Sequence, residues 1–540
     1  MMRAESPPSF APQPRKCRIR TKRQSPHRDA QNRMLVWKIR TCKTESEEDT
    51  LLSTKRVSFW VAGGLWVCAG WSLPVVAQVG QSSVAMGIPP SQSLVGDTSA
   101  LAREAQEWLV ELVKINTTNP PGNEQAATKY IAGVLAKEGI NAELLDVAPG
   151  RSALVARLRA SAVPDPSKAL LLVAHLDVVG VDKSKWTVDP FGGVVKDGYV
   201  WGRGSIDDKS MVAANLAAFI ALKRGNVFLN RDVIFLATTD EEQFGEASLK
   251  ILIAKYWDKF AAGFAINEGG KVVMKNGKVQ YVGLQVAEKV SVNLSVTATG
   301  KGGHSSVPTK DNPVVHLAAA VEKIGNYTTP VRLTSVVRRY FEGLAGIEDA
   351  ETAKWLRVID TPDRGEHAQR VIADMNPMWN SMMRDTLAPT VLQAGVRANV
   401  IPSDARAIVN VRLIPGDTID VLVNELKKQV NDLSVKIEVM PDGGLAAPDS
   451  SMETPLYALM TKLCAKEFGG APVLPFLSTG ATDSAQLRLH NVQAYGLRPM
   501  PMSQEDDARV HGDNERLPLD SFAKGVDLMT RLVAEFAVSR

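Results

Sequence analysis

Hydrophobic residues follow two patterns in the first part of the folded sequence. Helical spacing over residues 102–115 and 124–138 predicts two amphipathic helices, and short apolar runs at 141–147 and 153–159 predict strands. Ala169–Ala174 is instead continuously apolar, which is typical of a strand covered on both faces in a parallel or mixed sheet. This alternation of helices and strands favours a layered α/β domain.

Histidines and acidic residues follow several of these apolar runs, or lie in glycine-containing loops between them. Five segments carry them: His175 with Asp177, Asp207 with Asp208, Asp240 to Glu242, Glu268, and His511 to Glu515. The sequence predicts that the strand carrying Glu268 ends there, before two glycines. Because active sites of open α/β sheets gather at strand ends, we expect these segments to lie close together.

Each segment taken alone also fits a purely structural role. His175 fits a hydrogen-bonded core histidine, Asp207 and Asp208 fit an acidic cap on the helix predicted at 211–223, and the three acids after Thr239 fit a solvated strand end. Gly202 and Gly204 permit a tight backbone path, but the phosphate-loop pattern G-x-x-x-x-G-K-[ST] is absent there. Only the number of such segments favours a common site.

Two histidines and at least three carboxylates, without a cysteine, suit zinc, cobalt or manganese. The set is large enough for two metal ions that share one bridging carboxylate, with a further carboxylate left over as a base. The two-residue spacing of His175 and Asp177 would place both side chains on one face of a strand. We therefore expect the Asp177 carboxylate to bind one imidazole nitrogen and leave the other for a metal.

The five motifs together resemble the M20 metallopeptidases. They are H-L-D-V-V from His175, G-R-G-S-I-D-D-K around Asp207, T-T-D-E-E ending at Glu242, N-E-G-G at Glu268, and V-H-G-D-N-E at His511. The resemblance runs from about Ala102 to the C-terminus, and the carboxypeptidase S and N-fatty-acyl-amino-acid hydrolase branch is the most similar. It implies an α/β zinc-peptidase catalytic domain, with a mixed sheet flanked by helices, and an inserted smaller α+β lid and dimerisation domain.

The resemblance implies two Zn²⁺ ions per subunit, with Co²⁺ or Mn²⁺ as alternatives, and a role for each site residue. His175 and Glu268 would hold one ion, Glu242 and His511 the other, and Asp207 would bridge them. Glu241 would be the general base and then the acid that protonates the leaving nitrogen. Asp177 would orient His175.

In the lid, residues 289–297 alternate apolar and polar positions, which predicts a strand with one exposed face. The resemblance implies that His304 stabilises the oxyanion, often from the neighbouring subunit, and that Asn399 and Arg412 bind the substrate's carboxylate and carbonyl. Backbone amides of the small-residue loop around Gly480 are expected to bind the substrate's backbone. Residues 330–390 have no assigned role.

The rest of the 540-residue chain sets the domain boundaries and the compartment. The sequence predicts a catalytic domain at 99–288 and 442–540, with the lid at 289–441. Residues 1–54 are predicted to be a disordered or mis-annotated N-terminus, and the residues before Met34 are a translation artefact if Met34 is the true start. The basic and then apolar segment 55–77 predicts a secretory signal peptide, or a membrane anchor if it is not cleaved. A linker follows at 78–98, and the mature protein is expected to be secreted or periplasmic.

Composition and motifs favour an enzyme that acts on small molecules. Of the residues, 45% are hydrophobic and 23% charged, and the net charge of +4 indicates no nucleic-acid surface. The leading hypothesis is a zinc hydrolase that cleaves an amide next to a free carboxylate, in a peptide or an N-acyl amino acid. A catalytically silent binding protein and a two-zinc aminopeptidase are the alternatives. A homodimer through the lid follows if His304 acts in the neighbouring subunit, whereas a monomer would require His304 to act within its own chain or to be unimportant.

Overall fold

The computed structural model describes residues 95–539, except residues 162, 244, 246, 442 and 445. The predictions for residues 1–77 and for most of the linker at 78–98 lie outside the described residues. Between residues 95 and 539, apart from those five positions, no helix is both long enough and apolar enough to cross a membrane.

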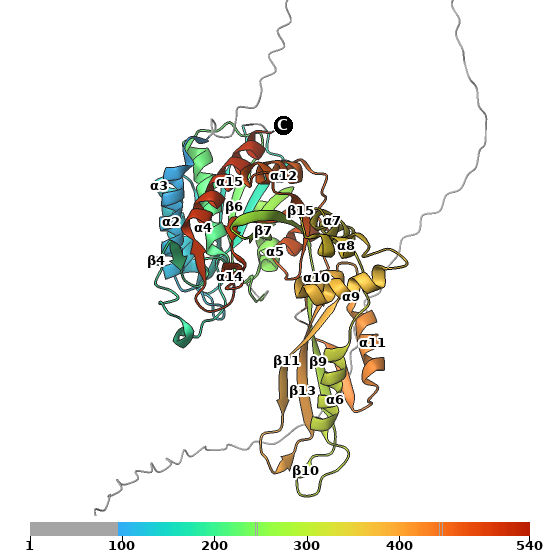
Figure 1. Ribbon diagram of the computed structural model, residues 1–540. Helices are drawn as coiled ribbons and strands as arrows, with labels where there is room; N and C mark the ends of the chain where they lie inside the picture. Colours follow the sequence, from blue (N-terminus) through green and yellow to red (C-terminus); the bar gives the residue numbers. More distant parts are fainter. Residues whose placement is uncertain are drawn as a thin grey trace, which may run out of the picture. The chain divides into compact units, whose positions relative to one another are not determined.

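The described part of the catalytic domain is built on an eight-stranded mixed sheet with the order β1-β2-β6-β3-β7-β16-β8-β15 (Figure 1). The β6, β3, β7 and β16 strands are mutually parallel, while β1, β2 and β8 introduce antiparallel pairs. The strands are β1 (Ala142–Ala148), β2 (Arg151–Leu158), β3 (Leu170–His175), β6 (Val233–Thr238), β7 (Phe264–Lys275), β8 (Lys278–Glu288), β15 (Val473–Ser478) and β16 (Gln493–Met502).

Helices cover both faces of this sheet, which explains the continuous apolar runs of its central strands. On β3, Leu170 and Leu172 join the hydrophobic core on one face, whereas Leu171 and Val173 join the core on the other. The helices of this domain are α2 (Thr98–Lys114), α3 (Glu124–Lys137), α4 (Lys209–Arg224), α5 (Leu249–Phe260), α12 (Pro455–Glu467), α13 (Ser484–Leu489), α14 (Gln504–Asp507) and α15 (Leu519–Val538). The prediction of a mixed sheet flanked by helices is confirmed.

A smaller antiparallel sheet is inserted between β8 and β15, in the order β11-β13-β9-β14 for the described strands (Figure 1). On β9 every second side chain, from Val290 to Ala298, is buried against α6 and α11. The elements are β9 (Val290–Thr299), β10 (Gly303–His304), α6 (Pro313–Asn326), β11 (Thr386–Ala394), β12 (Val400–Ile401), β13 (Asp404–Leu413), α11 (Ile419–Val430) and β14 (Val435–Val439). The predicted α+β lid is confirmed as a fold.

Most of the segment without an assigned role, 330–390, forms helices that pack on the catalytic domain, whereas its last residues begin β11 of the lid sheet. Phe341 and Trp379 belong to the same hydrophobic core as Phe476 of β15, and the hydroxyls of Tyr340 and Tyr281 lie 2.8 Å apart. The helices are α7 (Ser335–Leu344), α8 (Ala350–Arg357), α9 (Gly365–Met375) and α10 (Pro377–Met383). By packing, this part of the 289–441 range therefore belongs to the larger domain.

One predicted strand boundary is wrong. The strand that carries Glu268 does not end there, because β7 continues to Lys275. Its pairing with β16 shifts register around Glu268, where a Cβ on Gly270 would lie 2.1 Å from the carbonyl oxygen of Gly496. Gly270 therefore allows close approach of the neighbouring backbone at a bulge, Gly269 leaves room for the Gln285 side chain, and neither glycine terminates the strand.

Candidate active site

The five motif segments meet at one edge of the large sheet. His175 is the last residue of β3, Glu241 and Glu242 follow β6, and Glu268 lies within β7. Asp207 comes from the loop that precedes α4, and His511 comes from the loop before a short strand, β17 (Arg516–Pro518). β17 pairs with β5 (Tyr199–Trp201), and β5 pairs with β4 (Val194–Lys196), so the two loops are anchored to the same small sheet.

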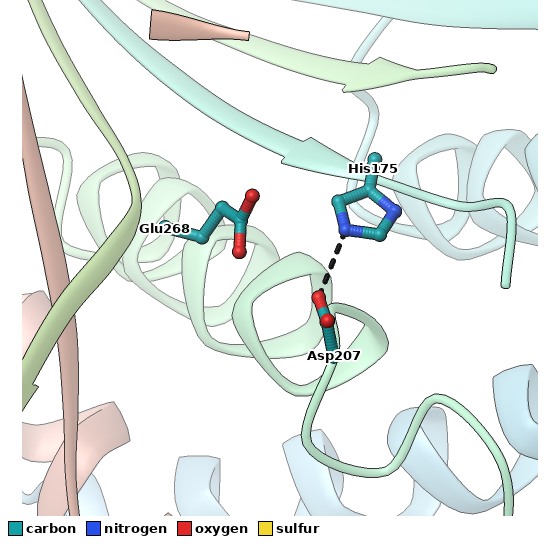
Figure 2. Close-up of side chains that lie close together, drawn as sticks. All are labelled: His175, Asp207 and Glu268. Atoms are coloured by element: carbon teal, nitrogen blue, oxygen red, sulfur yellow. Dashed lines mark hydrogen bonds and ion pairs between the residues drawn. The ribbon is translucent and has the colours of Figure 1, made fainter. Parts of the chain in front are cut away.

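Among the described residues, two groups of side chains have ligand atoms that lie within 4.8 Å of one another, and both include Asp207. The first contains His175, Asp207 and Glu268, which Figure 2 shows facing a common space. The second contains Asp207, Glu242 and His511. Oδ1 of Asp207 lies 3.0 Å from Nε2 of His175, and Oδ2 lies 3.0 Å from Nε2 of His511.

The donor set fits divalent metal ions. Glu242 Oε2 lies 3.2 Å from Nε2 of His511, whereas Oε1 of Glu242 is buried and has no hydrogen-bond partner. A buried carboxylate oxygen without a partner is costly in a folded protein unless an ion binds it. Imidazole and carboxylate donors, with one carboxylate shared between two groups, are the ligands that zinc, cobalt and manganese accept.

The ionisable groups of the site shift one another's pKa values. Burial opposes protonation of His175, but its hydrogen bonds with Asp177 and Asp207 raise its pKa well above the usual value. Burial and the charge of Asp207 raise the pKa of Glu268 to about 8. Burial and the charge of Glu268 also raise the pKa of Glu241. Crowded carboxylates of this kind repel one another, and bound cations would relieve that repulsion.

Glu515 holds the loop that carries Asp207, a role that the motif alone did not indicate. Its fully buried carboxylate accepts hydrogen bonds from the backbone N–H groups of Ile206 at 2.7 Å and Asp207 at 3.2 Å. It also accepts one from Nη1 of Arg203 at 2.6 Å. The last acid of the V-H-G-D-N-E motif therefore fixes the backbone of the shared ligand.

Asp177 differs from its prediction, because β3 ends at His175 and Asp177 lies in the loop beyond it. Nδ1 of His175 is 3.0 Å from the backbone carbonyl oxygen of Asp177 and 3.6 Å from the nearest carboxylate oxygen. The carboxylate instead accepts hydrogen bonds from the backbone N–H groups of Glu241 and Glu242, each at 3.1 Å. Asp177 thus positions both the histidine and the acidic loop.

Asn119 connects this loop to a second buried carboxylate, and sequence reasoning missed it. Its Nδ2 donates to Asp177 Oδ2 at 2.9 Å and to Asp240 Oδ1 at 2.7 Å. Arg151 in turn donates to Asp240 at 3.1 Å. The only sequence signal was the Asn-Pro-Pro-Gly turn, and the bonds join residues 58 and 121 positions apart.

The predicted lid residues lie in two places. His304 and Asn399 meet at the β10–β12 pair, where both are exposed and the N–H of Ser305 donates to the carbonyl oxygen of Asn399 at 3.1 Å. Within the described chain, no hydrogen bond or ion pair joins His304 to the acidic cluster; its Nδ1 lies 2.7 Å from Oγ of Ser306. Arg412 lies near the other end of β13 and is half-buried. Burial lowers its pKa, and the charge of Glu241 opposes this shift.

Gly480 lies in the exposed loop after β15. Its backbone N–H donates to Oγ of Ser478 at 3.2 Å, so this amide is engaged within its own loop. The loop is tied to the large sheet a few residues later, because Oγ1 of Thr482 donates to Glu288 at 2.8 Å. Its role in substrate binding stays a prediction.

Comparison with known proteins identifies the family. The model of peptidase family M20/M25/M40 matches residues 171–535. The chain belongs to this family. It is a carboxypeptidase-like M20 metallopeptidase or amidohydrolase, and the resemblance based on the five motifs is confirmed.

Relatives of this M20 enzyme include curated proteins and solved structures. Human N-fatty-acyl-amino acid synthase/hydrolase is 30% identical over 377 residues, covering 68% of this chain and 74% of that protein. A Dictyostelium discoideum protein named "Probable carboxypeptidase S-like 2" is 29% identical over 376 residues, covering 68% and 71%.

Among solved structures, a metallo-carboxypeptidase from Sulfolobus solfataricus aligns with a TM-score of 0.62 at 20% identity, covering 81% of this chain and 100% of that one. Human carnosine dipeptidase 1 aligns with a TM-score of 0.59 at 16% identity, covering 83% and 99%. Both solved structures share the fold of this M20 enzyme.

Replacing Asn119 tests the network behind the acidic loop. Asn119→Ala leaves Asp177 and Asp240 without their shared donor, so we expect the free energy of unfolding to fall by about 1–3 kcal/mol. Displacement of Glu241 should lower kcat by about 10- to 100-fold. Asn123→Ala, which removes only a 3.4 Å exposed hydrogen bond, should change neither by a comparable amount. Denaturant unfolding and steady-state kinetics provide the two readings, and equal effects of both variants would contradict the assignment.

Proposed function

We propose that this M20 enzyme is a two-metal hydrolase that cleaves an amide bond next to a free carboxylate. The observation that supports it is the pair of ligand groups that share Asp207. A further carboxylate, which belongs to neither group, lies beside them. That carboxylate is Glu241, whose Oε2 lies 4.0 Å from Nε2 of His175. Two metal positions and an adjacent base are the parts that amide hydrolysis by an activated water requires.

His175 and Glu268 would hold one Zn²⁺ ion, Glu242 and His511 the other, and Asp207 both, with Co²⁺ or Mn²⁺ as alternatives. A solved Bacillus subtilis protein of 14% identity is described as a dinuclear metal-binding peptidase of the M20 family, which supports the count. When bound, such ions lower the pKa of a water molecule and polarise the amide carbonyl.

The protein's own side chains carry the proton. In the proposed reaction, Glu241 accepts the proton of the attacking water on a carboxylate oxygen and then donates it to the leaving nitrogen. Its burial keeps bulk water away from this transfer. Arg412 binds the substrate's free carboxylate, and His304 donates a hydrogen bond to the negatively charged oxygen that forms on the carbonyl.

The substrate class rests on the relatives. The human relative is named for N-fatty-acyl-amino acids and the Dictyostelium relative for carboxypeptidase S. Both kinds of substrate, an N-acyl amino acid and a small peptide, present an amide followed by a carboxylate. We propose that the substrate belongs to one of these two classes.

A panel of N-acyl amino acids and dipeptides, followed by mass spectrometry with the zinc-loaded protein, tests the reaction. We expect cleavage in at least one of the two classes, and a fall in kcat of about 10²- to 10⁴-fold in Glu241→Gln. Glu366→Gln makes the same chemical change on an exposed helix and should leave turnover unchanged. No cleavage in either class, with zinc demonstrably bound, would contradict the proposed function.

Metal stoichiometry tests the shared ligand without any need for turnover. By elemental analysis after dialysis we expect about two zinc ions per chain in the wild type and about one in Glu268→Gln. Asp207→Asn should retain less than one, because it weakens both positions at once. Asp513→Asn, an exposed acid near His511, serves as the control. If Asp207→Asn keeps one ion firmly, the two positions do not share that residue.

We further propose a homodimer through the lid, in which His304 serves the active site of the partner. Its exposure on the lid supports this. Mixing inactive His304→Ala and Glu241→Gln chains would then give mixed dimers with one intact site, and about a quarter of wild-type activity should return. A monomer in sedimentation, or no recovery after subunit exchange, would contradict the dimer.

A further inference from the structure

One face of the lid sheet is polar, and Arg412 lies on it. The alternate side chains of β9 and β13 that are not buried against α6 and α11 point to this face. Arg412 and Asn410 are two residues apart on β13, and Asn293 is the cross-strand partner of Asn410 on β9. The three side chains therefore form a row on the face of the sheet that α6 and α11 do not cover.

A chain of hydrogen bonds runs along this row. Nε of Arg412 donates to Oδ1 of Asn410 at 3.0 Å. Nδ2 of Asn410 donates to Oδ1 of Asn293 at 2.9 Å and lies 3.4 Å from Oγ of Ser291. Each atom of the Asn410 amide is thus used, which defines the orientation of that amide: oxygen toward Arg412 and nitrogen toward β9.

Among the described residues, the bond from Nε is the only hydrogen bond of the Arg412 side chain, and no carboxylate of those residues forms an ion pair with it. Its two terminal nitrogens are therefore available, and they form the planar fork that binds a carboxylate through two parallel bonds. Burial lowers the pKa of Arg412, and the negative charge of Glu241 partly opposes that shift. A carboxylate bound there would lie near the base that acts on the neighbouring amide.

We propose that Asn410 is a positioning residue: it fixes Arg412 through Nε so that both terminal nitrogens face the substrate's free carboxylate. This inference rests on the proposed function, because it assigns Arg412 to the carboxylate of an amide substrate. A neutral acceptor suits this role. An aspartate at position 410 would also accept from Nε, but its charge would neutralise the guanidinium and compete with the substrate.

Binding of a matched pair of compounds tests this inference, and it does not depend on turnover. The probes are N-acetyl-L-phenylalanine and N-acetyl-L-phenylalaninamide, which differ only in the free carboxylate. Titration calorimetry with zinc-loaded protein carrying Glu241→Gln should give tighter binding of the acid than of the amide. Adding Asn410→Ala should weaken acid binding about tenfold and leave amide binding within about twofold.

Two further variants separate positioning from a general effect on the lid. Asn410→Asp should weaken acid binding more than Asn410→Ala, whereas a merely structural role predicts the opposite order because the acceptor is retained. Ser295→Ala, on the same face of β9, should leave the acid-to-amide ratio unchanged. Because the ratio is taken within each variant, a partly unfolded preparation does not alter it.

The outcomes are decisive in each direction. Equal weakening of both compounds by Asn410→Ala, an unchanged ratio, or no preference of the parent protein for the acid would overturn the inference. Failure of the proposed function would be seen separately, as absent turnover by the wild type. The ratio of acid binding to amide binding can be measured in that case too. With Arg412→Ala as the reference for complete loss of the preference, adding Asn410→Ala to it should have little further effect.

Discussion

The fold of this M20 enzyme depends on holding several acidic side chains together at one sheet edge. Gathering Asp207, Glu241, Glu242 and Glu268 around one site costs free energy in the absence of cations, since the carboxylates are buried or half-buried and repel one another. The protein compensates with neutral donors and cations behind the site. Backbone N–H groups bind Asp177, Arg203 neutralises Glu515, and Arg151 contacts both Asp240 and Glu124. These groups hold the ligand residues in place from behind. The ligand atoms that face the site are left for metal ions.

The sheet supplies the geometry for this arrangement. Parallel β3, β6 and β7 bring their carboxyl ends to one edge, so residues far apart in the sequence become neighbours without long side chains. The bulge at Glu268 lets β7 deliver a ligand from its middle while it continues into the pairing with β8. Asp207 and His511 arrive from loops tied to the same small sheet, and Glu515 connects them through a carboxylate.

The base of the lid is built around a buried ammonium group. Nζ of Lys289, between β8 and β9, donates to the carbonyl oxygens of Ser381 at 3.0 Å and Arg384 at 2.8 Å. Burial lowers the pKa of Lys289 to about 7. The Lys289 side chain therefore joins two places at which the chain passes from the catalytic domain into the lid. Because α7 to α10 pack on the catalytic core, the chain segment that leads from α10 into the lid starts from a fixed position. Arg412 lies close to the base of the lid.

Sequence alone determined the chemistry and the local structure. Apolar runs and helical spacing located β3, α2 and α3 within a few residues, because a strand buried on both faces and an amphipathic helix each impose a short-range pattern. The five motifs identified the family, while the signal segment and the role of His304 remain predictions. Only the tertiary structure decided that β7 passes through Glu268 and that residues 335–383 pack on the larger core. It also revealed Asn119, Glu515 and Asn410 as positioning residues. Each of these depends on contacts between distant or cross-strand residues, such as the 309 positions that separate Ile206 from Glu515, and no local pattern encodes them.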